Sequence, residues 1–277
     1  MAFRRPGIYK TPDELRRMLR PGLLTAASLD AVAAAIRPGV TTGELDAIAE
    51  KTIRDGGGEP NFMLVPGYSK TTCVSVNDDV VHGIPGDRVL VAGDIVSVDS
   101  GAQLEEWNGD SARTFVVEGV ADPARTEARR ELNRVTEQSL WHGIAALATA
   151  RHLNQVGEAI EEYVESQGTY GILEDYVGHG IGRSMHEEPP VFNYRVRGNG
   201  PAVKAGLVVA IEPMITAGGI ETFTQSDDWT VTTSDGSDSA HWEHSVAVHP
   251  GGVWVLTAAD GGASGLEPLG VRPVPLP

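Results

Sequence analysis

The segment IVSVDSGAQLEEWNGDSARTF, from Ile95 to Phe115, predicts two neighbouring strands, and each carries an aspartate where they join. Asp99 ends one alternating apolar run and Asp110 begins the next. Aspartate is among the poorest strand formers and is rarely buried without a partner. In a hairpin-like pair both carboxylates can lie on one face of the sheet, where they would repel unless a cation lay between them. Two ordinary turn aspartates are the alternative, so the rest of the chain has to decide.

Composition limits the classes of protein to which this segment can belong. The chain has 277 residues, 41% of them apolar, which suffices for one large domain or two smaller ones. A formal net charge of −16 argues against nucleic acid or an anionic membrane as the main partner. No apolar run approaches the ~20 residues of a membrane span, and no secretory signal is predicted. Cys73 is the only cysteine, which excludes an internal disulfide and a cysteine-built zinc site. We expect a soluble, cytoplasmic protein.

Helical patterns open the chain. The sequence Thr11–Glu14 has an N-cap residue, a proline at the first helical position and a capping-box glutamate. Pro21-Gly22 then interrupts the pattern, which predicts either two helices or one kinked helix ending near Ile36. Another helix is expected from about Thr42 to Arg54, where glycines follow.

The period of the apolar residues changes to two between Thr71 and Val117, which predicts strands. Helical patterns return at 123–147 and 153–166, and short strands follow Gly168. The two halves also share a weak repeat, because Leu45, Ala49, Ile53 and Gly57 match Val156, Ile160, Val164 and Gly168 at an offset of 111 residues. Any two amphipathic helices that end in glycine would give such matches. The order of elements predicts an α+β domain in which helices cover one face of an antiparallel sheet.

Two histidines lie in a glycine-rich stretch of the second half. The sequence GHGIGRSMHEEPP contains His179 and His186, with Gly178, Gly180 and Gly182 around the first. These glycines predict a loop with close backbone approach and positive φ, which suits a loop pressed against a ligand. One histidine alone is more often structural than functional, whereas two beside such a loop point to a site.

Two glutamates lie in apolar runs that predict strands, Glu212 in VVAIEPMIT and Glu243 in SAHWEHSVAV. A buried glutamate is rare unless it is paired or bound to a metal. Two aspartates, two glutamates and at least one histidine suit Mn²⁺, Fe²⁺, Co²⁺ or Zn²⁺. Four carboxylates would neutralise two such cations, and a metal pair ~3.5–4 Å apart is a standard way to activate one bridging water for hydrolysis.

Six motifs in order give a specific resemblance. No H-E-x-x-H, G-x-S-x-G or Walker sequence occurs. From roughly Lys10 to Leu256 the chain instead resembles type I methionine aminopeptidases, in their short bacterial form. The motifs that carry the resemblance are VVHGIP, DIVSVDSG, NGDSARTF, GHGIGRSMHEEP, AIEPM and HWEHSVAV.

The resemblance implies the pita-bread fold, a pseudo-symmetric curved antiparallel sheet with helices on its outer face. We expect that domain over residues 10–258, after an N-terminal arm (1–9) and before a Gly/Pro-rich tail (259–277). The last part of the tail, EPLGVRPVPLP (267–277), is expected to be extended or disordered. The resemblance also implies removal of the initiator methionine before a small second residue, by attack of a metal-bridging hydroxide. Nascent N-termini are the expected partners, with transient ribosome contact, and we expect a monomer.

The resemblance implies a role for each motif residue. Two divalent ions (Co, Mn, Fe or Zn) would be bound by five residues, with Asp110 and Glu243 bridging. His82 and His186 would hydrogen-bond the substrate amide and the developing oxyanion, and Glu212 would also carry a proton to the new amine. The expected metal ligands are Asp99, Asp110, His179, Glu212 and Glu243. The expected methionine pocket is lined by Phe62, Tyr68, Cys73, Met185 and Trp229, whose soft and aromatic groups suit a thioether.

Two features depart from the family pattern. His241 stands where many relatives have glutamine, and Pro21-Gly22 stands where relatives tend to run a continuous helix. Two other functions remain as alternatives. One is an Xaa-Pro aminopeptidase of the same fold, although those enzymes usually carry a large N-terminal domain. The other is a non-catalytic relative that binds protein or ribosome, although such relatives have typically lost metal ligands.

Overall fold

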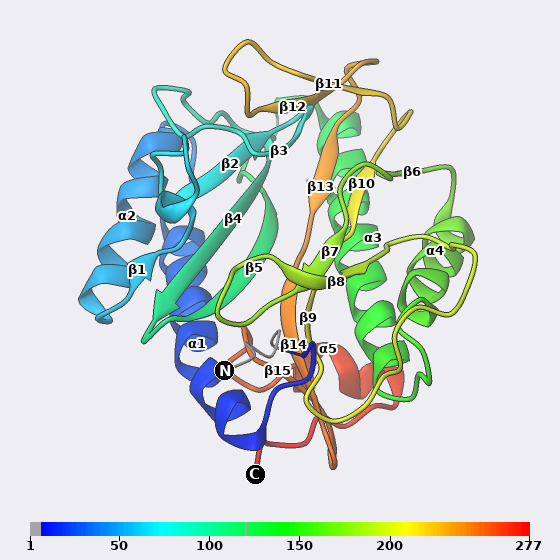
Figure 1. Cartoon of the computed structure of the whole chain (residues 1–277). Helices are drawn as coiled ribbons and strands as arrows, with labels where there is room; N and C mark the ends of the chain where they lie inside the picture. The colour runs from blue at the N-terminus through cyan, green and yellow to red at the C-terminus, as the bar shows by residue number, and fades with distance from the viewer. Residues whose placement is uncertain (1–6, 120) are drawn as a thin grey trace.

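The computed structural model describes residues 7–119 and 121–277, in which helices pack against antiparallel sheets (Figure 1). In the first half, a helix pair covers a four-stranded sheet. Its elements are α1 (Pro12–Ala35), α2 (Thr42–Asp55), β1 (Glu59–Pro60), the 3-10 helix η1 (Phe62–Leu64), β2 (Thr72–Val76), β3 (Asp79–Val81), β4 (Ile95–Leu104) and β5 (Trp107–Val116).

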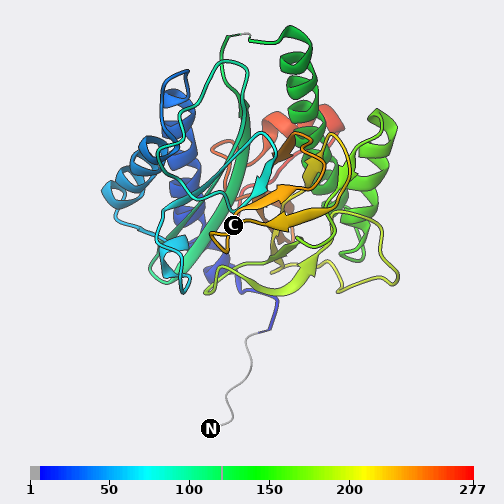
Figure 2. The ribbon, with the colours of Figure 1, turned by 90° about the horizontal axis from the view of Figure 1, so that it is seen from above.

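The second half repeats the order of helices followed by strands. Its helix pair lies on the opposite side of the strands from the first pair (Figure 2). The elements are α3 (Pro123–Leu147), α4 (Gln155–Gln167), β6 (Gly171–Ile172), β7 (Gly178–Gly180), β8 (Glu187–Val191), β9 (Val208–Ile211), β10 (Met214–Thr216), β11 (Thr222–Thr224), β12 (Val231–Thr233), β13 (Ser239–His241), β14 (His244–His249), β15 (Gly252–Val255), α5 (Ala263–Leu266) and the 3-10 helix η2 (Glu267–Leu269). The predicted α+β class is confirmed.

The sheets divide along the same line. β5, β4, β2 and β1 form the sheet of the first half, and β15, β14, β9, β7 and β8 form that of the second. Two three-stranded sheets, β13-β10-β6 and β11-β12-β3, lie beside them. The apolar residues of the repeat are buried in α2 and α4, the second helix of each half: Leu45, Ala49, Ile53, Val156, Ile160 and Val164.

Helix α1 runs through Pro21 without a break, so the single-helix alternative is the observed one. The capping box at Thr11 is present, with Thr11 and Glu14 exchanging hydrogen bonds. Gly22 explains why the helix continues, because it is buried where a Cβ would lie 2.5 Å from the Leu256 carbonyl oxygen. Gly109 of β5 packs against the same turn, since its own Cβ would lie 2.7 Å from Gly22. Tertiary packing therefore overrides the local cost of the proline.

The end of the chain packs on the second half. Leu266 of α5 is fully buried, and beyond η2 the chain has no helix or strand. The Val274 N–H donates to the Val253 carbonyl (3.0 Å), and the Val274 carbonyl lies 2.8 Å from His249 Nε2. These contacts hold the proline-rich segment against β14 and β15. In the described ranges, no helix is both long enough and apolar enough to cross a membrane.

Candidate metal centre

Asp99 and Asp110 lie on one face of the β4–β5 hairpin. Gly101 pairs with Asp110 and Asp99 pairs with Ala112, so the two carboxylates are diagonal neighbours across the strands. The prediction that the aspartates lie where the two strands join is wrong, because both strands continue past them to a two-residue turn at 105–106. Both turn residues have positive φ, the geometry of a tight hairpin. Gly101 is needed for packing, since a Cβ there would lie 2.1 Å from Asn61.

Glu212 and Glu243 lie at strand breaks, and the prediction that they lie inside strands is wrong. Glu212 follows the end of β9, and Glu243 precedes the start of β14. Ile211 pairs with His244 and Met214 pairs with His241, so the two interruptions face each other across the sheet. The break frees each glutamate from the alternation of a regular strand, which lets its side chain point towards the hairpin aspartates. Asn193 Nδ2 donates to the Glu212 carbonyl (3.1 Å) and holds one side of this break.

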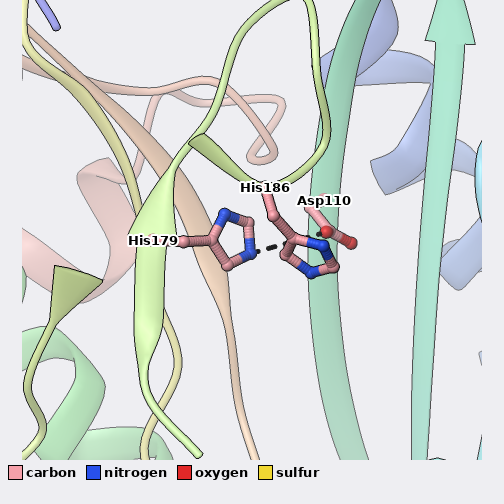
Figure 3. A group of neighbouring side chains, drawn as sticks. All are labelled: Asp110, His179 and His186. Atoms are coloured by element: carbon pink, nitrogen blue, oxygen red, sulfur yellow. Dashed lines mark ion pairs between the residues drawn. The ribbon is translucent and has the colours of Figure 1, made fainter. Parts of the chain in front are cut away.

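His179 lies in the middle of β7 and points its ring at the carboxylates. Nδ1 lies 2.9 Å from the Gly180 carbonyl, which fixes Nδ1 as the protonated nitrogen and leaves the Nε2 lone pair free. Nε2 is 3.5 Å from Glu212 Oε1 and 3.9 Å from Asp110 Oδ2. Figure 3 shows His179, His186 and Asp110 converging from β7, the following turn and β5.

The glycines around His179 serve strand packing, not a loop. Gly178 and Gly180 belong to β7, and a Cβ at Gly180 would lie 2.2 Å from the Glu188 carbonyl oxygen. Close backbone approach is therefore confirmed, but the approach is to neighbouring strands. The expected positive φ is wrong at 178, 180 and 182, which do not have it.

The turn that carries Met185 and His186 is fixed from outside the site. Glu187 accepts a hydrogen bond from Lys10 Nζ (2.7 Å), and the Lys10 side chain is only 6% exposed. Asn108 Nδ2 donates to the Gly182 carbonyl (3.0 Å). The centroid of the His186 ring lies 4.4 Å from that of His179. Sequence reasoning missed Lys10 and Asn108, since both act on a segment distant in the chain.

Within the described residues, no lysine or arginine pairs with the four acids of the cluster. In the described part of the chain, Asp99 Oδ1, Asp110 Oδ1 and Glu243 Oε1 are buried and lack hydrogen-bond partners. Burial raises the pKa of Asp99 to about 7, and it raises the pKa of Glu212 to about 7. Burial, followed by the neighbouring carboxylates, raises the pKa of Asp110 and that of Glu243 well above the usual range. Four acids thus share one space where protons or cations have to balance their charge.

The residues present fit divalent cations. Three groups of three residues bring their ligand atoms within 4.8 Å of one another: Asp99, Asp110 and Glu243; His179, Glu212 and Glu243; Asp110, His179 and His186. Oxygen donors with imidazole nitrogen are the ligands that Mn, Fe, Co and Zn accept. The buried carboxylate oxygens that lack hydrogen-bond partners are the atoms that such cations would bind. The third group also leaves His186 within reach of a cation.

The predicted site residues all line one cavity of about 160 Å³, and Val65 completes its wall. Its apolar end is formed by Phe62, Val65, Tyr68, Cys73, Met185 and Trp229, which pack together. Tyr68 stands edge-on to Trp229, with ring centroids 4.9 Å apart, and its hydroxyl donates to the Thr72 carbonyl (2.7 Å). The other end is the carboxylate cluster. Val65 carries no sequence signal, because an aliphatic loop residue has no distinguishing pattern.

His82 lies between this cavity and a second one of about 380 Å³. Its φ of +60° is rare for a residue with a side chain and is typical of functional sites. Its ring stands edge-on to Tyr176, with centroids 5.4 Å apart. Burial lowers the pKa of His82 to about 4, so the imidazole is neutral at neutral pH. The second cavity adds Tyr176 and His241 to the residues around Glu212.

Comparison with known families agrees with this geometry. The model of metallopeptidase family M24 matches residues 16–250. Methionine aminopeptidase 1 of Bacillus subtilis is 42% identical over 250 residues, which cover 90% of this chain and 98% of that protein. Methionine aminopeptidase 1 of Mycobacterium tuberculosis is 44% identical over 254 residues, 90% of this chain and 94% of its own.

Solved structures show the same fold. The methionine aminopeptidase from Rickettsia prowazekii has a TM-score of 0.85 at 35% identity, and the match covers 90% of this chain and 99% of that one. The prolidase from Pyrococcus furiosus has a TM-score of 0.69 at 21% identity, and only 66% of its chain is covered, so it shares the fold alone. The predicted pita-bread fold is confirmed.

Proposed function

The chain belongs to metallopeptidase family M24, and on that premise we propose that it removes N-terminal methionine from peptides and nascent proteins with a small second residue. One observation carries the proposal: a single cavity has a sulfur- and aromatic-lined end beside a cluster of carboxylates. The relatives from Bacillus subtilis and Mycobacterium tuberculosis, of whose lengths 98% and 94% are covered, are named methionine aminopeptidases. The chemistry of the cavity wall suits the thioether of methionine.

We propose that two divalent ions, Co, Mn, Fe or Zn, bind at the carboxylate cluster. Asp99, Asp110, His179, Glu212 and Glu243 would be their ligands, with Asp110 and Glu243 shared between the two. Both shared residues are nearly fully buried, 3% and 2% exposed, and each belongs to more than one of the ligand groups. When bound, such cations act as Lewis acids and provide a water-derived nucleophile at neutral pH.

The chain's own residues would then bind, orient and transfer a proton. We propose that His82 and His186 hydrogen-bond the substrate amide and the oxyanion that develops on its carbonyl. Both line the cavity, and His82 is neutral at neutral pH, so one ring nitrogen can donate. Glu212 would carry a proton to the leaving amine, a role supported by its place in the wall of the same cavity.

Trp229 and Tyr68 would hold the methionine side chain. Asp227 caps the turn that carries Trp229, because its carboxylate accepts the backbone N–H groups of Trp229 (2.9 Å) and Thr230 (2.8 Å). Tyr68 is locked by its hydroxyl bond to the chain. Two fixed aromatic walls favour a linear thioether over a branched or charged side chain.

The proposal also covers the extent of the domain, the substrates and the compartment. We propose residues 10–258 as the catalytic domain, since the family model matches residues 16–250 within it. We propose that the substrates are N-termini of nascent chains, met in the cytoplasm by a monomer with transient ribosome contact. The names of the relatives support the substrate. The single cysteine, which is buried and free, supports a reducing compartment.

An assay of metal-reconstituted protein on Met-Ala-Ser and on an Xaa-Pro peptide separates this proposal from its alternatives. We expect release of methionine from the first peptide only. Cleavage of the Xaa-Pro peptide with Met-Ala-Ser left intact would instead support a prolidase-like peptidase. Protein that binds metal but cuts neither peptide would support a non-catalytic binding protein.

A further inference from the structure

His241, the last residue of β13, has a backbone held on three sides. Its N–H lies 2.9 Å from Thr114 Oγ1 and 3.2 Å from Ser97 Oγ. Its carbonyl accepts from Thr114 Oγ1 (2.7 Å), and the residue pairs with Met214 across the sheet. The side chain is 3% exposed. The imidazole therefore has little freedom to turn away from what it faces.

The ring of His241 faces Glu212. Its Nε2 is buried and has no hydrogen-bond partner among the described residues, and it lies 3.6 Å from Glu212 Oε2. The other oxygen of that carboxylate, Oε1, lies 3.5 Å from His179 Nε2. Glu212 is thus bracketed by two imidazoles. Nδ1 of His179 donates to the Gly180 carbonyl, so Nε2 of His179 has a lone pair and no proton to donate. Any hydrogen bond from an imidazole to Glu212 therefore has to come from His241.

We propose that His241 is a positioning residue for Glu212, whose Oε2 accepts a hydrogen bond from the His241 Nε2–H. This bond holds Oε1 towards His179 and the carboxylate cluster. The proposal rests on the function proposed above, because it assigns Glu212 its orientation as a ligand and proton carrier. A buried donor has to find an acceptor, and Glu212 Oε2 is a carboxylate oxygen 3.6 Å away. Hydrogen bonds of this kind are often long without ligand and shorten in the working complex.

A direct ligand role for His241 fits the geometry less well. In the described ranges, the groups whose ligand atoms lie within 4.8 Å of one another place Glu212 with His179 and Glu243, and do not include His241. An imidazole that orients a ligand carboxylate tunes the site without joining it. The two roles predict different numbers of bound ions, so they can be separated.

The test uses two amides that imitate different ring nitrogens. His241→Gln places an N–H near the position of Nε2, whereas His241→Asn ends near Nδ1, short of Glu212. Both are polar and similar in size to histidine. His249→Asn is the matched control, because His249 is also buried and hydrogen-bonded but contacts Val274 at the far end of β14. Co²⁺ stoichiometry and affinity are measured by calorimetry, and kcat and KM on Met-Ala-Ser.

We expect His241→Asn to bind the same number of Co²⁺ ions as the wild type, with Co²⁺ affinity or kcat lowered about 10- to 100-fold. His241→Gln should recover most of that loss, and His249→Asn should match the wild type in both. Wild-type behaviour of His241→Asn, or a folded His241→Gln as poor as His241→Asn, overturns the proposal. Loss of one ion in His241→Asn overturns it in favour of a ligand. If the wild type releases no methionine, the proposed function fails, while the Co²⁺ affinities still decide the role of His241.

Discussion

Two groups of acids in this protein, the ion pairs of Asp238 and the carboxylate cluster, differ in where the balancing charge comes from. At the N-terminal end of α3, Asp238 accepts hydrogen bonds from Arg129 (2.8 and 2.9 Å) and from Arg125 (2.9 and 3.1 Å). Burial acts to raise the pKa of Asp238, but these bonds outweigh it and the pKa is lowered. In the carboxylate cluster, Asp110 and Glu243 have raised pKa values and are surrounded by further acids.

This difference distinguishes a structural ion pair, at Asp238, from a metal-binding site, at the carboxylate cluster. Asp238 carries its counter-ions in the same chain, so its charge is satisfied as soon as the fold forms. The cluster has no such partner among the described residues, and burying it costs free energy unless a cation arrives from outside. Buried acids without a balancing charge are typical of functional sites. The missing charge is therefore the physical sign of the metal centre.

Removing a carboxylate from the cluster should have the largest effect. Asp110→Ala deletes a group that two of the ligand groups share. We expect loss of bound metal and a fall in turnover on the order of 10³-fold or more, because several kcal/mol of charge stabilisation depend on the cations. Without metal, the variant should be more stable than the wild type, since like-charge repulsion is relieved. Elemental analysis, kinetics and unfolding in chelator check all three, and an active variant with full metal content would contradict the account.

Removing Asp238, whose charge is balanced by arginines of the same chain, should lower stability and leave metal binding unchanged. Asp238→Ala leaves the guanidinium of Arg129, whose side chain is 8% exposed, without its main partner. We expect a loss of about 3–5 kcal/mol in the free energy of unfolding, with metal content unchanged in the folded protein. Denaturant unfolding measures the first and elemental analysis the second. Loss of metal without loss of stability would reverse the roles of the two regions.

His186 tests how far the cluster extends. His179→Ala removes a proposed ligand and should lower metal content, whereas His186→Ala should keep its metal and lose about 10²–10³ in kcat. The ligand group of Asp110, His179 and His186 makes this a real alternative (Figure 3). Metal loss in His186→Ala equal to that in His179→Ala would place His186 among the ligands. Near-normal turnover would remove it from catalysis.

The two regions should respond to pH with opposite signs. Asp99 and Glu212 have pKa values of about 7 in the folded chain, so in metal-free protein these two groups bind more protons than in the unfolded chain between their ordinary values and that pH. Their contribution to stability should therefore rise as the pH falls from above 7 towards about 4. The stability that Asp238 contributes, with its lowered pKa, is present above its ordinary range and is lost below it. Melting temperatures in chelator of the wild type and of Asp99→Asn check the sign across this range, because their difference isolates one of these groups, and a flat difference would contradict it.

Local sequence patterns predict which segments are helices or strands and which residues line the cavity. They predict less well where strands break and turn. The capping box at Thr11 fixed where α1 begins, and one-face placement of Asp99 and Asp110 followed from hairpin pairing. The sequence does not reveal the strand breaks at Glu212 and Glu243, because each glutamate lies within a longer run that has apolar residues on both sides.

Other features depend on contacts between distant segments and leave no local trace. The passage of α1 through Pro21 depends on Gly22 meeting Gly109 and Leu256. The Lys10–Glu187 ion pair joins residues 177 positions apart. The orphaned Nε2 of His241 is visible only when β13 is placed beside Glu212.

The central claim is that divalent cations supply the charge missing from the carboxylate cluster. The most direct measurement is thermal unfolding of the wild type at neutral pH, first in chelator and then with Co²⁺ or Mn²⁺ at about 100 times its dissociation constant. Binding to the folded state should add about 2.7 kcal/mol, which raises the melting temperature by roughly 5–10 °C and restores activity. An unchanged melting temperature with full activity in chelator would contradict the account.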